Sequence, residues 1–106
     1  MKPLGSHNYF IYTLTNKTKK VLYIGVTNDI KVRIYYHKNP GLVTKIPFTT
    51  KYKCYYLVYY ERFEYIEHAL EREKQLKKWR RSKKDELIAT INPNWDFLND
   101  QLDNEW

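Results

Sequence analysis

Residues 8–29 have the sequence NYFIYTLTNKTKKVLYIGVTND, from which the start of the sheet can be predicted. Two segments rich in aromatic and β-branched residues, 8–15 and 21–26, enclose the polar residues 16–20. Such segments favour extended backbone, and a short polar connection between them is typical of a β-hairpin. The sheet of this protein is therefore predicted to begin with two antiparallel strands.

The chain after the hairpin first predicts a short helix. Thr27 and Asn28 offer a helix cap, and the spacing of residues 30–37 fits a helix that ends at residues 39–41, Asn-Pro-Gly. The following residues, 40–53, contain Pro47 and several threonines without a clear period, so this segment is predicted to be a loop.

A third strand is predicted over residues 53–61, which are dense in Tyr and Val. Regular alternation places Leu57 and Tyr59 on one face of this strand and Val58 and Tyr60 on the other. Helical spacing follows, first over residues 64–78 and then from Ser82 through Ile91. The expected fold is α/β (α+β), with a small three-stranded antiparallel sheet flanked by about three helices in the order β-β-α-β-α-α.

The size and composition of the chain limit what it can be. Its 106 residues, 42% of them hydrophobic, are enough for one domain. We assign residues 8–98 to that domain, residues 1–7 to an N-terminal extension and residues 99–106 to an acidic C-terminal tail. Cys54 is the single cysteine, which excludes an intramolecular disulfide. No apolar run approaches the ~20 residues of a membrane span, and no secretory signal is present, so we expect a cytoplasmic protein without a membrane partner.

Positive charge is concentrated on one stretch of the chain. Lys and Arg number 19 against 12 Asp and Glu, which gives a formal net charge of +7. Seven of these basic residues fall between Lys74 and Lys84, whereas all the charged residues from Asn94 onward are acidic. Clustering of this kind is expected of a surface that binds a phosphate backbone, although many charge runs are only solvated. The sequence therefore favours a polyanionic partner.

One carboxylate stands out in the helical segment that precedes the basic stretch. Glu73 recurs at helical spacing with apolar residues, so that Ile66, Ala69, Leu70 and Leu76 are expected to share its face of the helix. A charged carboxylate in that position costs several kcal/mol unless it is paired or bound to a cation. Two interpretations remain open at this point, a salt bridge to a structural arginine and a bound metal ion.

On the order of these residues the chain resembles the GIY-YIG nuclease family. The second tripeptide of the family name is intact as Tyr23-Ile24-Gly25, Arg33 lies ten residues after that Tyr, and Glu73 completes an Ala-Leu-x-x-Glu pattern. The sequence around these residues is similar to that of the small stand-alone bacterial branch of the family, whose members consist of the nuclease domain alone. The chain departs from the pattern at Phe10, where the name has Gly, and at Val26, where some relatives have a lysine. It also shows no clear counterpart of an asparagine that other branches carry after the glutamate.

The resemblance implies a role for each site residue. The expected catalytic residues are Tyr12, Tyr23, Arg33, His37 and Glu73, with Gly25 as a structural residue of the site. Glu73 is expected to hold one Mg²⁺ or Mn²⁺ ion together with retained waters, and Arg33 to pair with the scissile phosphate. Either Tyr12 or Tyr23 assists the attacking water, while His37 acts as an acid or base or holds a phosphate oxygen.

The function implied is a metal-dependent endonuclease that hydrolyses phosphodiester bonds in DNA with low or structure-dependent sequence specificity. Lys77, Arg80 and Arg81 are the expected contacts with the nucleic-acid backbone, and Lys45 and Lys51 are further candidates. DNA or another nucleic acid is the expected partner of a monomer or weak homodimer, with specificity supplied by a protein partner or by dimerisation. Two alternatives remain: a nucleic-acid-binding protein that keeps the scaffold with little or no cleavage, and a protein-interaction module.

Overall fold

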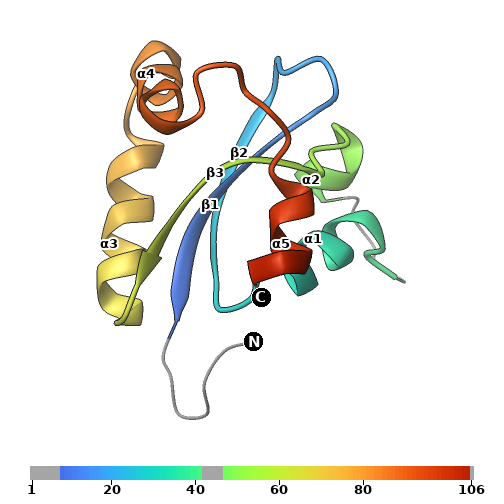
Figure 1. Ribbon diagram of the computed structural model, residues 1–106, viewed down its shortest axis with the longest axis horizontal. Helices are drawn as coiled ribbons and strands as arrows, with labels where there is room; N and C mark the ends of the chain where they lie inside the picture. Colours follow the sequence, from blue (N-terminus) through green and yellow to red (C-terminus); the bar gives the residue numbers. More distant parts are fainter. Residues whose placement is uncertain (1–7, 42–46, 106) are drawn as a thin grey trace.

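The computed structural model describes residues 8–41 and 47–105 and shows a three-stranded antiparallel sheet (Figure 1). The strands are β1 (Tyr9–Thr15), β2 (Leu22–Thr27) and β3 (Tyr56–Phe63), in the spatial order β2-β1-β3. The predicted hairpin is confirmed, since β1 pairs with β2 from Phe10 opposite Thr27 to Thr15 opposite Leu22. The central strand β1 is buried on both faces, which explains why its sequence is apolar almost throughout.

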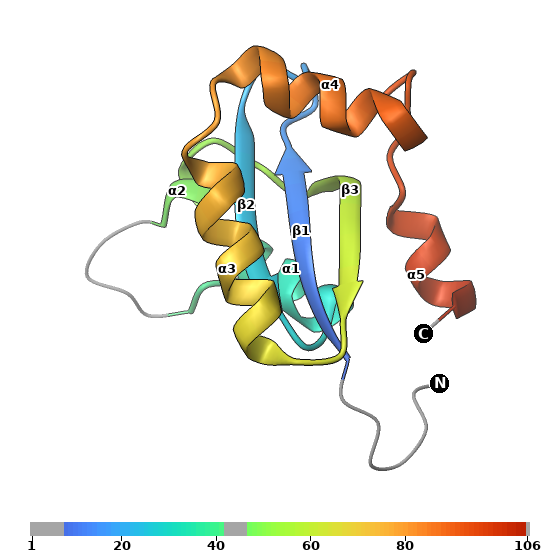
Figure 2. The same cartoon turned by 90° about the vertical axis from the view of Figure 1, so that its left-hand side faces the viewer.

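Five helices surround this sheet in the described part of the chain. They are α1 (Ile30–Lys38), α2 (Phe48–Lys51), α3 (Ile66–Lys77), α4 (Arg81–Ile91) and α5 (Asn99–Glu105). Helix α3 covers one face of the sheet, whereas α1 and α5 lie on the other, and α4 crosses one end of the strands (Figures 1 and 2). The α+β fold class is confirmed. None of the helices in the described residues is long and apolar enough to cross a membrane.

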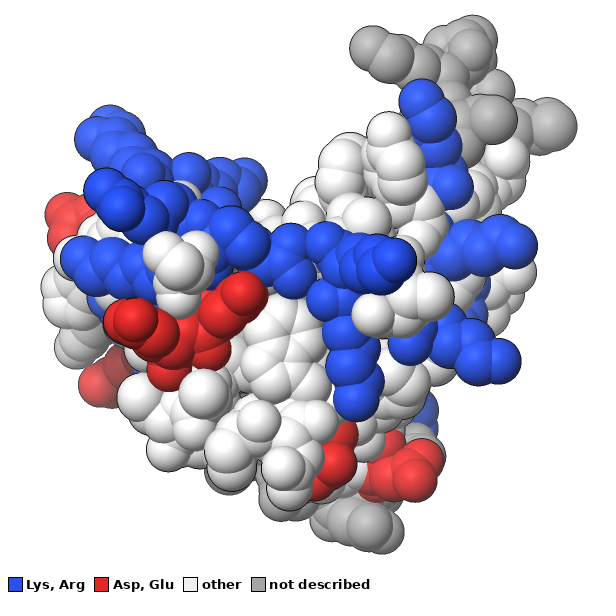
Figure 3. Space-filling model, turned by 90° about the horizontal axis from the view of Figure 1, so that it is seen from above, with Lys and Arg blue, Asp and Glu red and all other residues white. Residues whose placement is uncertain are grey.

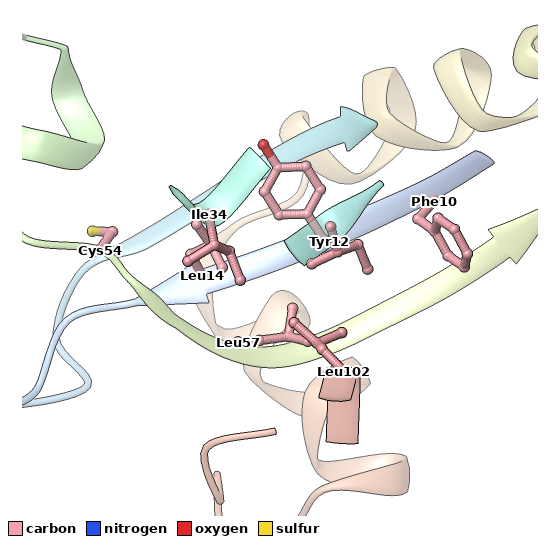
Figure 4. Packing of buried hydrophobic residues seen from close by; sticks show 8 residues of the cluster. Phe10, Tyr12, Leu14, Ile34, Cys54, Leu57 and Leu102 are labelled. Carbon is pink, nitrogen blue, oxygen red and sulfur yellow. The ribbon is translucent and has the colours of Figure 1, made fainter. Parts of the chain in front are cut away.

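The two faces of the sheet carry separate hydrophobic clusters. On the face of α1 and α5, the buried members are Phe10, Tyr12, Leu14, Ile30, Ile34, Cys54, Leu57 and Leu102 (Figure 4). On the face of α3 and α4, they are Ile11, Ile24, Val58, Tyr59, Ala69, Leu76 and Ile88. Burial of apolar area on both faces stabilises the domain at about 25 cal/mol per Å². The catalytic candidate Tyr12 belongs to the first cluster.

The predicted alternation of β3 is wrong beyond its first residues. Thr13 of β1 pairs with Tyr59, but the next residue, Leu14, pairs with Leu57, so the register shifts by one residue at Val58. Val58 and Tyr59 consequently pack into the same cluster, on the face of α3. A β-bulge of this kind adds one residue to one strand and interrupts the two-residue period.

Helices occur in two segments where the sequence predicted none. The loop predicted over residues 40–53 includes α2, and the acidic tail predicted over residues 99–106 includes α5. Helix α5 belongs to the packed domain because Leu102 is only 4% exposed and the Asn99 side chain bonds β3, accepting from the Leu57 N–H at 2.9 Å. One apolar residue and one amide are thus enough to hold this acidic segment against the sheet.

Candidate active site

Tyr12 and Gly25 lie opposite each other on β1 and β2, and the contact between them shapes the site. A Cβ atom on Gly25 would lie 2.6 Å from the Tyr12 hydroxyl oxygen and 2.7 Å from Cζ. The phenol ring therefore lies directly against the glycine, where a side chain would have to displace it. The Tyr12 side chain is fully buried and extends from β1 on the side of the sheet that carries Ile34 of α1 (Figure 4).

The hydroxyl of Tyr12 is hydrogen-bonded to His37 of α1. The distance from Tyr12 Oη to His37 Nε2 is 2.9 Å, and the other ring nitrogen, Nδ1, lies 2.7 Å from Thr49 Oγ1 of α2. Thr50 adds a bond from its hydroxyl to the His37 carbonyl at 2.7 Å. Both nitrogens of the imidazole are thus bonded inside the protein, and a chain of three side chains connects β1, α1 and α2.

Burial changes the protonation of both members of the Tyr12–His37 pair. Burial, together with the neighbouring Tyr23, raises the pKa of Tyr12 well above its ordinary value, and the guanidinium of Arg33 offsets part of this rise. Burial and the positive charge of Arg33 lower the pKa of His37 to about 4. Near neutral pH, Tyr12 therefore keeps its proton and the imidazole is uncharged.

Two proton arrangements satisfy this chain. In the first, the Tyr12 O–H donates to Nε2 and the His37 Nδ1–H donates to the Thr49 hydroxyl. In the second, the Thr49 O–H donates to Nδ1 and the Nε2–H donates to Tyr12, which leaves the phenol proton for another acceptor. Both arrangements keep the phenol and the imidazole neutral, so the chain is satisfied without placing a charge in the core.

A pocket of ≈ 300 Å³ opens beside this chain. The lining residues are Tyr23, Arg33, Tyr36, His37, Pro40, Pro47, Phe48 and Thr49. The Tyr23 ring lies 5.2 Å from the His37 ring and 6.2 Å from the Tyr12 ring, measured between centroids. The structure thus brings together four of the residues expected to be catalytic, three of them at the pocket wall and Tyr12 beneath it.

Glu73 comes from α3, on the other face of the sheet. Its side chain is 22% exposed and its carboxylate lies 3.3 Å from the Nζ of Lys77, one helical turn later. The expectation that Glu73 faces the core is therefore only partly right, and its partner is a lysine rather than an arginine. Leu70, expected on the same face, is 49% exposed. Helix α3 packs through Ala69 and Leu76, so the buried stripe is narrower than the apolar pattern indicated.

The Glu73–Lys77 pair lies beside the edge strand β2 that carries Tyr23. Lys77 lines a second pocket together with Leu22, Tyr23, Ile24, Phe48 and Lys84. Tyr23 and Phe48 border both pockets, so they connect the Tyr12–His37 side of the edge strand with the α3 side. Lys77 therefore links Glu73 to the second pocket, and Tyr23 and Phe48 link that pocket to the one that holds Arg33.

Glu73 offers one carboxylate to a metal ion beside the second pocket. Among the residues whose side chains are described, 8–41 and 47–102, no three or more His, Cys, Asp or Glu are arranged to hold a metal. Mg²⁺ is usually bound by one or two carboxylates, with waters and phosphate oxygens in the remaining positions. Glu73 satisfies that requirement as one carboxylate at a partly exposed position.

The predicted nucleic-acid contacts have different surroundings. Arg80 is exposed at the start of α4, and Lys51 of α2 lies with its Nζ 5.4 Å from the centre of the Tyr52 ring. Arg81 is occupied within the protein, because its guanidinium donates to Asp85 at 2.8 Å and to the carbonyl of Lys20 at 2.7 Å. Lys77 is paired with Glu73, and Lys45 lies outside the described residues.

Thr49 is a site residue that the sequence analysis missed. It is 1% exposed and bonded to His37, from which it is separated by twelve positions. No periodic pattern connects the two residues, because the contact arises where α2 packs against α1. The only local signal of structure there was Pro47, which precedes the first residue of α2.

Comparison with known proteins agrees with the order of these residues. Residues 8–86 match the family described as the GIY-YIG catalytic domain. A UPF0213 protein of Bacillus pumilus (strain SAFR-032) is 35% identical over 88 residues, which cover 83% of this chain and 86% of the relative. The solution NMR structure of a UPF0213 protein from Bacillus halodurans superposes with a TM-score of 0.51 at 27% identity, covering 83% of this chain and 89% of the other. The chain therefore belongs to the GIY-YIG catalytic domain family.

Proposed function

We propose that this protein is an endonuclease that hydrolyses phosphodiester bonds in DNA with the help of one divalent metal ion and with low or structure-dependent sequence specificity. Membership in the GIY-YIG family implies a nuclease-like function. The observation that carries the proposal is the buried Tyr12–His37 hydrogen bond beneath a pocket lined by Tyr23 and Arg33.

Arg33 is the residue suited to hold the phosphate. Its side chain is exposed on α1, one turn before His37, and it lines the pocket. No ion pair joins Arg33 to a carboxylate within residues 8–41 and 47–102, so its charge is not neutralised there. A guanidinium can donate two parallel hydrogen bonds to phosphate oxygens, which both binds and orients the reacting group.

The difference in burial between Tyr12 and Tyr23 suggests a different role for each. Tyr23 lines the pocket and is partly exposed, so its hydroxyl can hold the attacking water by a hydrogen bond. Tyr12 is fully buried, and its high pKa makes it a poor base near neutral pH. We assign to Tyr12 and His37 a positioning role, because their bond fixes both rings against Tyr23.

A divalent ion at Glu73 would supply a Lewis acid that offsets charge developing on the phosphate and on the leaving oxygen. Lys77 holds the Glu73 carboxylate at 3.3 Å without such an ion. With Glu73 holding such an ion, Lys77, which lines the second pocket, would be available to bind a phosphate oxygen.

The experiment compares plasmid nicking by the wild type, Glu73→Gln and Glu71→Gln, each with Mg²⁺, with Mn²⁺ and with EDTA. Glu71 is the matched control because it lies two positions away on α3 and is exposed. We expect metal-dependent nicking by the wild type and Glu71→Gln, and a loss of about 10²-fold or more in Glu73→Gln. Equal nicking by Glu73→Gln and Glu71→Gln would contradict the assignment of the site. Binding of DNA without nicking in either metal would instead favour a nucleic-acid-binding protein.

A further inference from the structure

The turn between β1 and β2 is fastened to the start of α4 by one arginine. The Arg81 guanidinium donates to the carbonyl of Lys20 at 2.7 Å and to the carbonyl of Lys19 at 3.2 Å. It also bonds Asp85 and lies 5.7 Å from the centre of the Trp95 ring. Segments about sixty positions apart in the sequence therefore form one surface at this end of the molecule.

Both segments that meet there are basic. The turn contributes Lys17, Lys19 and Lys20, and the α4 side contributes Arg80, Lys83 and Lys84, a set that we call the hairpin surface. Figure 3 shows this end of the molecule, where Lys and Arg side chains gather across the face and Asp and Glu form smaller groups. Asp85 is already paired with Arg81. Crowding like charges raises the free energy of the folded state, so such a surface favours a polyanionic partner.

The hairpin surface is continuous with the pocket that holds Arg33. Lys84 of the hairpin surface lines the second pocket beside Tyr23 and Phe48, and these two aromatic residues also border the first pocket. A polyanion whose phosphate lies on Arg33 can therefore pass Tyr23 and Phe48 to reach Lys84 and then the turn.

We propose that the hairpin surface binds the phosphate backbone of the nucleic acid that flanks the cleaved bond, as a second contact site apart from the pocket. This inference rests on the proposed nuclease function. It adds lysines of the β1–β2 turn, which the clustering of basic residues in the sequence did not indicate. It also assigns Arg81 to supporting the turn, whereas the sequence predicted a contact with phosphate.

The side chains of the hairpin surface suit the backbone rather than the bases. Five of the six are lysines, which bind phosphate as point charges and carry no planar face to stack on a base. The aromatic rings beside the hairpin surface already face cations, since Lys83 lies 4.1 Å from the centre of the Trp79 ring, Lys19 5.3 Å from that of Phe97 and Arg81 5.7 Å from that of Trp95. Contacts of this kind add affinity without sequence preference and weaken as salt rises.

The test neutralises two turn lysines and leaves the fastening of the turn intact. Lys17→Gln with Lys20→Gln removes two charges, while Arg81 still bonds backbone carbonyls that the substitutions do not change. The control, Lys31→Gln with Lys38→Gln, removes the same charge from exposed positions of α1. Binding is measured in EDTA, which prevents metal-dependent cleavage, by fluorescence anisotropy across a series of salt concentrations. The probes are a DNA duplex of about 30 base pairs and a single strand of that length, long enough for several phosphate contacts.

We expect the turn variant to reduce the slope of log affinity against log salt by roughly 1 to 2 on at least one probe, since each lost phosphate contact removes about 0.7 to 0.9. The control should keep a slope near that of the wild type. The melting temperature of the turn variant at low salt should equal or exceed that of the wild type, because like-charge repulsion is relieved.

Equal slopes for the turn variant and the control on both probes would overturn the inference, and so would failure of the wild type to bind either probe. A lower melting temperature together with unchanged slopes would show that the lysines support only the fold. Because binding is measured without cleavage, this outcome is separate from the nicking result. A wild type that nicks DNA but shows no difference between the variants refutes the hairpin surface alone.

Discussion

Gly25→Ala tests whether the missing side chain on β2 sets the position of Tyr12. The added methyl group would lie 2.6 Å from the Tyr12 hydroxyl oxygen, 2.7 Å from Cζ and 2.9 Å from Cε1. Comfortable contacts between such atoms are about 3.5–4.0 Å. Tyr12 is fully buried, so its ring has no solvent-filled space into which it can retreat. The ring must therefore shift against the core, away from its bond with His37.

The cost follows from two contributions. Overpacking a core by one methyl group costs about 1–3 kcal/mol. Separating the Tyr12 hydroxyl from Nε2 leaves a buried nitrogen of His37 without its partner, at about 1–3 kcal/mol. Alanine recovers about 0.5–1 kcal/mol relative to glycine within a strand. We expect a net loss of roughly 2–4 kcal/mol, which is a large part of the 5–15 kcal/mol of a typical domain.

The assay is urea unfolding of the wild type, Gly25→Ala, Tyr12→Leu and the double variant. A double-mutant cycle should show that the cost of Gly25→Ala falls by about 1 kcal/mol or more once the Tyr12 ring is removed. Gly41→Ala is the control: its φ of +72° disfavours alanine, but no atom lies within 4 Å of the new Cβ, so no coupling to Tyr12 is expected. Gly25→Ala with wild-type stability, or an equal cost with and without the Tyr12 ring, would refute this account.

Three further predictions concern the site and the hairpin. Because the pKa of His37 is about 4 when folded and 6.5 when unfolded, stability should fall by roughly 2–3 kcal/mol as pH drops from about 6.5 to about 4, and an NMR titration of His37 with an ordinary midpoint would contradict this. Tyr12→Phe should lower the free energy of unfolding by about 1–3 kcal/mol, far more than Tyr35→Phe at a 60% exposed position, as urea unfolding can measure. Arg81→Gln should cost about 1–2 kcal/mol and speed hydrogen exchange in the turn, whereas unchanged exchange would show that Arg81 does not hold it.

Local patterns were sufficient for the hairpin and for the helix that follows it. The spacing that brings Tyr12 opposite Gly25 is fixed by the short turn, and the four-residue step from Arg33 to His37 is fixed by the helix. Sequence spacing could therefore predict which site residues are neighbours on the hairpin and which share a face of the helix. The bulge at Val58 could not, because no residue type at that position requires one.

The surroundings of Glu73 and Thr49 depended on tertiary packing. A helical pattern gives the direction in which Glu73 points but not the width of the buried stripe, which Ala69 and Leu76 determine by packing on the sheet. Lys77 was predicted to contact DNA on the strength of its charge, yet it also neutralises Glu73. Thr49 meets His37 only because α2 packs on α1, a contact that the intervening sequence does not signal.

We expect the phosphodiester to be cleaved at the pocket beside Tyr12 and His37. The direct measurement is the single-turnover cleavage rate of a labelled DNA by Arg33→Gln, compared with Lys31→Gln on an exposed position of the same helix. With enzyme in excess, Arg33→Gln should lose about 10²-fold or more in rate, while Lys31→Gln should stay near the wild type. Equal rates for the two variants would contradict it, because the phosphate would then react elsewhere.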